Sequence, residues 1–169
     1  MKCNLSAERL RQLFSYDPET GVFIRVANSG ARYRNRKIGQ IAGWKDARGY
    51  VVFRVENSKY MAHRLAWLYM TGHWPKQFID HINGMKSDNR FANLREADDF
   101  INAQNIRQAN RASQSGLLGA SFKPEMKKPW AAQIQVNGRM KRLGFYDTAE
   151  EAHAAYLKAK RQLHAGCTI

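Results

Sequence analysis

The sequence predicts an α+β protein, in which short antiparallel strands and a few helices occupy separate stretches of the chain. Val51, Phe53 and Val55 recur at every second position, which is typical of a strand. Asn137-Gly138 joins two further strand-like runs and is typical of a two-residue hairpin turn. Thr148-Ala149-Glu150-Glu151 is a capping box that begins an alanine-rich helix. Sheets joined by tight turns, with helices packed on them, are therefore expected.

Size and composition exclude several classes of protein. A chain of 169 residues suits one or two small domains and is too short for a full (β/α)₈ barrel. No apolar run approaches the roughly 20 residues of a membrane helix, and the first residues do not resemble a secretory signal, so a soluble, cytoplasmic protein is expected. Only Cys3 and Cys167 are present, which excludes a four-cysteine zinc site, so a metal ion would need oxygen and nitrogen ligands.

Positive charge is the most distinctive global property. The chain has 28 Lys and Arg against 14 Asp and Glu, a net charge of +14 and a pI of about 10.1. The excess lies in residues 1–60 and 110–169, whereas residues 61–109 are almost neutral. This distribution favours a polyanionic partner, most often nucleic acid. An anionic membrane surface, ribosomal RNA and simple solubility are the alternatives.

The first expected segment, residues 1–58, is basic and contains short strands. We expect a helix around residues 6–14 that ends in a turn at 16–21, and then strands at 22–26, 37–44 and 50–55. Arg34 and Arg36 belong to a basic loop that would either clamp a phosphate backbone or lie in solvent.

The remaining chain predicts two more folded segments and a linker. Residues 59–109 predict a strand at 60–62, a helix at 63–71, a strand at 78–82 and, after the Asn83-Gly84 reversal, a helix at about 97–109. Residues 110–116 form a polar linker. Residues 117–169 predict a three-stranded antiparallel sheet, with strands at 118–122, 130–136 and 140–145, and one helix to about residue 164 that packs against it.

A group of polar residues in the middle segment carries the candidate chemistry. Asp80 offers a hard oxygen ligand for Mg²⁺ or Mn²⁺, and His81 can accept a proton from water near neutral pH. Asn102 adds a neutral oxygen from the expected helix. Neighbours on a regular strand point to opposite faces, so Asp80 and His81 serve one phosphate only if the strand ends or distorts there.

Several motifs in order resemble an HNH endonuclease of the phage and homing type: Ala62-His63-Arg64-Leu65-Ala66-Trp67, Ile79-Asp80-His81-Ile82-Asn83-Gly84, Asp88-Asn89-Arg90, Asn93-Leu94-Arg95 and Asn102-Ala103-Gln104-Asn105. The resemblance covers about residues 15–109 and implies a ββα-metal fold, acting in the cytoplasm of a phage-infected bacterial host. It also implies that Asp80 and Asn102 bind the metal, that His81 is the general base, and that Asn93 holds the loop between the strands.

The chain departs from the family pattern at Asn102, which replaces the family's final histidine. Asp98 and Asn105 are alternative ligands, because helical spacing puts them on the same face as Asn102. His81 and Asp80 could instead be structural, as a hydrogen-bonded histidine and a turn-capping carboxylate, and His63 is expected to be a packing residue at a helix start. The basic residues of this segment would contact phosphate or form solvated salt bridges: Lys86, Arg90 and Arg95.

Residues 117–164 resemble the APETALA and ethylene-response-factor DNA-binding domain, on the motifs Leu118-Gly119-Ala120-Ser121, Trp130-Ala131-Ala132-Gln133-Ile134-Gln135 and Arg142-Leu143-Gly144-Phe145-Tyr146. The resemblance implies that the sheet enters the major groove of DNA, where glutamine and arginine pair with base edges. Met140 also matches a contact position of that domain. The main DNA-contacting positions implied are Ser121, Lys123, Gln133, Gln135 and Arg142.

The sequence thus predicts a metal-dependent endonuclease that hydrolyses double-stranded DNA and is positioned by its C-terminal sheet. No membrane and no obligate protein partner are expected, and the chain would be a monomer or weak dimer. Two alternatives remain open. One is a sequence-specific DNA-binding regulator with an inactive nuclease fold, and the other is a basic RNA-binding structural protein.

Overall fold

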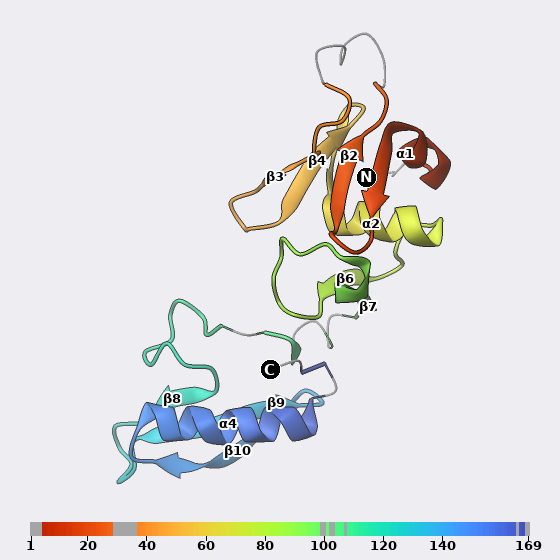
Figure 1. Ribbon diagram of the computed structural model, residues 1–169. Coiled ribbons are helices and arrows are strands. Elements are labelled where there is room, and N and C mark those ends of the chain that lie inside the picture. The colour runs from red at the N-terminus through yellow and green to blue at the C-terminus, as the bar shows by residue number, and fades with distance from the viewer. Residues whose placement is uncertain are drawn as a thin grey trace. The chain divides into compact units, whose positions relative to one another are not determined.

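The computed structural model describes residues 5–28, 37–98, 101, 104–106, 108–164 and 166–167. The chain forms two compact units, Met1–Asp98 and Asp99–Ile169 (Figure 1). Each unit contains both helices and strands, as predicted. The expected division at residues 58, 109 and 116 stays a prediction.

The first unit begins with the helix α1 (Ala7–Leu13), followed directly by a hairpin of β1 (Phe14–Asp17) and β2 (Val22–Arg25). The Ser6 side chain caps α1 by accepting a hydrogen bond from the amide of Arg9 at 3.1 Å. Gly21 ends the turn of the hairpin with φ of +72°, a conformation that favours glycine.

A three-stranded antiparallel sheet follows, in the order β3-β4-β5: β3 (Trp44–Lys45), β4 (Val51–Val55) and β5 (Ser58–Met61). It leads into the helix α2 (Ala62–Thr71), which ends at Gly72 in a left-handed conformation. Side chains from these elements and from α1 share one hydrophobic core, which includes Leu10, Phe14, Phe53 and Leu65. The N-terminal elements therefore belong to the same folded body as α2.

The candidate chemistry lies on a second hairpin of this unit. The strand β6 (Phe78–His81) pairs antiparallel with β7 (Leu94–Ala97), and the 3-10 helix η2 (Phe91–Asn93) lies between them in the chain. Ile79 and Leu94 anchor the hairpin in the core of the unit.

The second unit consists of a three-stranded antiparallel sheet, in the order β10-β9-β8, and the helix α4. The strands are β8 (Ala120–Phe122), β9 (Trp130–Val136) and β10 (Arg139–Tyr146), and α4 (Ala149–Leu163) packs against all three. The capping box is present, because Thr148 accepts from the amide of Glu151 and the Glu151 carboxylate accepts from that of Thr148. A Cβ on Gly119 would lie 2.1 Å from the ring of Tyr156, so helix and sheet are in close contact.

Three expectations about elements were wrong. A strand at 37–44 is reduced to a bridge between Ile24 and Ile41 and the short β3, because Gly39 and Gly43 take positive φ and interrupt the extended backbone. Residues 14–17 form β1, although the turn residues that follow suggested a turn from Tyr16. The helix expected from residue 97 does not begin there, since Ala97 pairs with Phe78 in the β6–β7 hairpin.

In the described part of the chain, no helix combines the length and hydropathy required to span a bilayer.

Candidate active site

Asp80 and His81 are the last two residues of β6, and both are buried, with 7% and 4% of their surface exposed. Neighbours on a regular strand point to opposite faces of the sheet. Here the tight turn after His81, closed by a hydrogen bond from the Gly84 amide to the His81 carbonyl at 2.8 Å, ends the strand at this point. The two side chains have different partners: Arg95 for Asp80 and Asn89 for His81.

Asp80 forms an ion pair with Arg95, its direct neighbour on β7. Arg95 donates to Oδ2 of Asp80 from Nη2 at 2.8 Å and from Nε at 3.0 Å. A buried ionic group costs free energy unless it is paired and hydrogen-bonded, and Arg95 supplies both kinds of contact. The hairpin thus pairs Asp80 with an arginine of the neighbouring strand.

The His81 ring lies among other aromatic rings and one amide. Its Nε2 is 3.3 Å from Oδ1 of Asn89, and its ring centre is 5.0 Å from that of His63 and 6.0 Å from that of Tyr50. Burial lowers the pKa of His81, and the hydrogen bond to Asn89 opposes that shift without cancelling it. His81 is therefore neutral at pH 7 and able to accept a proton.

His63 lies at the start of α2, as expected, but it also lies against the candidate base. Its ring meets the His81 ring edge to face, at an interplanar angle of 83°, and its buried Nδ1 has no hydrogen-bond partner among the described residues. Burial is the main cause that lowers the pKa of His63 to about 3, and the charges of His81 and Arg64 contribute to the same shift. The sequence pattern indicated a packing role and carried no signal of this contact with His81.

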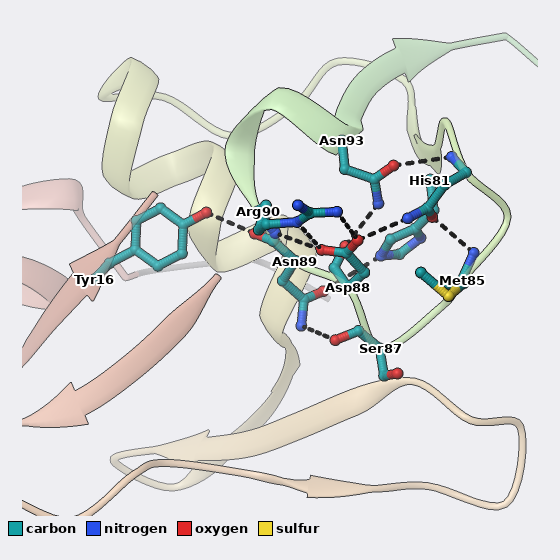
Figure 2. Close-up of polar contacts among 9 residues, drawn as sticks. Tyr16, His81, Met85, Ser87, Asp88, Asn89, Arg90 and Asn93 are labelled. Carbon is teal, nitrogen blue, oxygen red and sulfur yellow. Dashed lines mark hydrogen bonds and ion pairs between the residues drawn. The ribbon is translucent and has the colours of Figure 1, made fainter. Parts of the chain in front are cut away.

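Asn93 ties together the loop that connects β6 to η2 (Figure 2). Its Oδ1 accepts from the amide of Asn83 at 2.9 Å, and its Nδ2 donates to the carbonyl of Asp88 at 2.8 Å. Its own carbonyl accepts from the amide of Ile82 at 2.9 Å. These contacts fit a structural role for Asn93.

Asp88 strengthens the same loop. Its carboxylate accepts from the Arg90 guanidinium at 2.7 and 2.9 Å and from Nδ2 of Asn83 at 2.7 Å. Chiefly the hydrogen bonds from Arg90 lower the pKa of Asp88 to about 2. Arg90 thus forms a salt bridge inside the loop. Lys86 lies near the rings of the site, with Nζ 5.1 Å from the ring centre of Tyr50 and 3.3 Å from the carbonyl of Arg48.

The donor set bears on whether this site fits a metal ion. Among the residues that the structure describes, no cluster of three or more His, Cys, Asp or Glu gathers in a way that would hold one. Asp80 offers one buried carboxylate, which fits an ion such as Mg²⁺ that keeps water and substrate phosphate as its other ligands. Asn102 lies outside the described residues, Asp98 is exposed, and Asn105 is buried in the second unit.

The predicted DNA-contacting residues fall into two sets. Those of the second unit lie on its sheet or beside it: Gln133 opposite Arg142 in the register, Gln135 opposite Met140, and Ser121 and Lys123 on and after β8. Gln135 and Arg142 are exposed and Gln133 is half-buried. Ala132, which precedes Gln133, and Ile134, which lies between the two glutamines, are buried as the expected alternation requires, whereas Val136 is half-buried. Arg34 and Arg36 lie outside the described residues.

Comparison with known proteins identifies one related family. Residues 60–104, which include α2, β6 and β7, match the model of a family described as HNH endonuclease. Neither curated proteins nor solved structures gave a match. The family match supports a nuclease, which is a kind of hydrolase. HNH nucleases generally use divalent metal ions and act on DNA. The matched segment contains Asp80, His81, Asn93 and Arg95.

Proposed function

We propose that this chain is a metal-dependent DNA endonuclease that hydrolyses phosphodiester bonds with His81 as the general base. One observation carries the proposal: a buried, neutral histidine follows a buried carboxylate directly, at the end of a strand inside the segment that matches the HNH endonucleases. A neutral imidazole accepts a proton from water, and a paired carboxylate is available as a hard oxygen ligand.

Each residue of the site then has a distinct task. His81 takes the proton of the water that attacks phosphorus, while Asn93 and Asp88 fix the loop that follows His81. Asp80 and Asn102 would hold the ion, Mg²⁺ or Mn²⁺, which when bound supplies positive charge near the phosphate and the departing 3′ oxygen. Arg95, which pairs with Asp80, and Lys86, whose Nζ lies 5.1 Å from the ring centre of Tyr50, would supply positive charge to the DNA backbone. The product would carry a 5′ phosphate.

We further propose that the sheet of the second unit positions the enzyme on duplex DNA, in the manner of the APETALA and ethylene-response-factor domain. The exposed Gln135 and Arg142 support this role, because both side chains can pair with base edges. The major groove also admits a two-stranded β-ribbon, the kind of surface that neighbouring strands of this sheet present. Arg34 and Arg36 remain proposed backbone contacts. We also propose that the enzyme is of the phage or homing type, which the resemblance of its motifs implies.

The decisive experiment is cleavage of supercoiled plasmid with Mg²⁺ or Mn²⁺. We expect His81→Ala to lose cleavage by a factor on the order of 10² to 10⁴, because general base catalysis contributes about that much, while DNA binding persists. The matched control is His73→Ala, since His73 is an exposed histidine of the same unit. Equal cleavage by wild type and His81→Ala would disprove the proposed role.

The Asp80–Arg95 pair favours a second candidate function, a sequence-specific DNA-binding regulator. In this case the guanidinium would replace the ion permanently, and the nuclease fold would be inactive. The same plasmid experiment separates the two, because the regulator binds DNA in a salt-dependent way and cuts it with neither ion.

A further inference from the structure

The loop residue Asn89 contacts the imidazole of His81. Asn89 is 2% exposed, and its Oδ1 is the hydrogen-bond partner of His81 Nε2 at 3.3 Å. The other end of the same amide, Nδ2, donates to the carbonyl of Ser87 at 3.4 Å, which directs Oδ1 towards the histidine (Figure 2). An amide oxygen can only accept, so the neutral His81 ring carries its proton on Nε2.

The backbone around Asn89 is held from the N-terminal hairpin, far away in the sequence. The hydroxyl of Tyr16 on β1 donates to the carbonyl of Asn89 at 2.6 Å, in a buried position. Figure 2 shows this side chain reaching from β1 to the loop. Two residues later, the amide of Phe91 donates to the carbonyl of Pro18 at 3.0 Å.

The turn of the same hairpin approaches this loop so closely that only glycine fits. A Cβ on Gly21 would lie 2.4 Å from the carbonyl carbon of Asn89 and 2.5 Å from the amide nitrogen of Arg90. Both neighbours are backbone atoms, which cannot move aside as a flexible side chain can. The β1–β2 hairpin and the loop are thus in direct backbone contact.

We infer that Asn89 is a positioning residue for His81, and that the β1–β2 hairpin, which lies outside the segment matching the HNH endonucleases, holds Asn89 in place. The inference rests on the proposed function for its kinetic consequence. Its structural part, the choice of the His81 tautomer and ring orientation, concerns this chain alone. In this arrangement Tyr16 and Gly21 act on catalysis without touching the DNA or the attacking water.

The first test compares two substitutions of Asn89 in the full chain. Asn89→Asp keeps an acceptor oxygen at the same place, whereas Asn89→Leu keeps the size and removes the acceptor. The readout is the ¹⁵N spectrum of the His81 imidazole in alkaline solution, assigned by its loss in His81→Ala. We expect the Nε2–H tautomer in wild type and Asn89→Asp, and a mixture of tautomers in Asn89→Leu. A single unchanged tautomer in Asn89→Leu would overturn the inference.

The second test follows the hairpin. Tyr16→Phe should lower kcat roughly 3- to 10-fold with KM unchanged, since it removes one hydrogen bond from the support of Asn89. Gly21→Ala should lower kcat further, on the order of 10²-fold, because it displaces the loop. Gly72→Ala is the matched control: Gly72 has φ of +83° but no described atom within 4 Å of a Cβ, so it adds backbone strain without displacing the loop.

The two readouts keep failure of the inference apart from failure of the proposed function. If the variants show the expected tautomers but the wild-type chain cuts no DNA, Asn89 still positions His81 and the proposed nuclease function is wrong. A chain that cuts DNA, with kcat of Tyr16→Phe and Gly21→Ala both equal to wild type, loses the role of the hairpin. Melting temperatures of all variants identify any substitution that prevents folding, and in that case Asn89→Asp and Tyr16→Phe carry the tests.

Discussion

Two histidine rings in edge contact set the protonation state of the site. His63 and His81 have ring centres 5.0 Å apart, and both rings are buried. Charging either ring would place a cation in a poorly hydrated environment beside its neighbour, so both pKa values fall. His63 therefore stays neutral over a wider pH range than an exposed histidine, and its ring serves as an uncharged wall for His81.

This lowering predicts how stability depends on pH. In the unfolded chain His63 binds a proton below about pH 6.5, whereas in the folded protein it does so only near 3. The unfolded state then binds more protons between these values, so stability is full above pH 6.5 and falls with acidification by up to about 1.4 kcal/mol per pH unit. The free energy of unfolding, measured with denaturant at pH 7 and pH 5, should fall less between the two pH values in His63→Phe than in wild type.

The control for this measurement is His73→Ala, which removes an exposed histidine of the same unit. His81 continues to contribute in His63→Phe, so part of the loss should remain. The same stability difference between pH 7 and pH 5 in wild type and His63→Phe would show that His63 is protonated in the folded protein.

At the scale of elements, the β6–β7 hairpin brings charges together through its register. The pairing puts Asp80 directly opposite Arg95, so strand register alone brings the two side chains together. The Asp80 side chain is 8% exposed and that of Arg95 is 27% exposed, whereas the Asp88–Arg90 pair in the loop exposes 51% of the arginine. The two carboxylates are similarly buried, and the difference lies in the arginines, because Arg95 is more shielded from water than Arg90.

This difference predicts unequal effects of two matched substitutions. Arg95→Gln leaves a buried carboxylate short of a partner and should lower the free energy of unfolding by about 1–3 kcal/mol. Arg90→Gln removes a more exposed pair and should cost at most about 1 kcal/mol. Denaturation in EDTA measures both, and repeating it with Mn²⁺ should recover more stability in Arg95→Gln than in wild type. Equal losses in EDTA would mean that the Asp80–Arg95 pair is effectively solvated.

Local patterns predicted those elements whose signals lie within a few residues. The strand β9, the hairpin turn at Asn137-Gly138 and the capped helix α4 match the expectation, because turn and cap chemistry act over short distances. Ala97 was placed in a helix, and cross-strand pairing with Phe78 overrides that local preference. The motif residues Asp80, His81 and Asn93 were singled out from the sequence.

The support of the site could not be predicted in the same way. Asn89 was part of a motif but had no assigned role, since its amide acts through the position of His81. Tyr16 and Gly21 lie 73 and 68 positions away from Asn89 along the chain, and no local pattern links residues at that separation. Contacts of this kind depend on how hairpins pack, and packing is not encoded in the spacing of residues.

At the scale of the whole molecule, the net charge of +14 governs encounter with DNA more than recognition of a sequence. Positive residues release counterions from the phosphate backbone, so binding should weaken steeply as salt rises. A residue that reads bases would add an effect that depends on the DNA sequence, which separates the two contributions.

Two substitutions of equal charge test the proposed reading role of the second unit. Arg142→Ala removes an exposed charge from β10, and Lys158→Ala removes one from an exposed position of α4. We expect Arg142→Ala to weaken DNA binding more than Lys158→Ala does. If Arg142 contacts phosphate, its loss should also reduce the slope of log K against log salt by about 1. Fluorescence anisotropy over a salt series gives both quantities. Identical binding curves for the two variants would argue against DNA contact by this sheet.

The contact between Gly21 and the backbone of Asn89 limits how this nuclease could be transplanted. A graft of residues 60–104 alone would leave behind the tyrosine and the proline carbonyl that anchor the loop, together with the apolar side chains of α1 and β4. A portable module therefore needs the whole first unit together with the rest of the matched segment to residue 104. Designers who borrow it should keep its opening hairpin, even though no residue of that hairpin is part of the reacting centre.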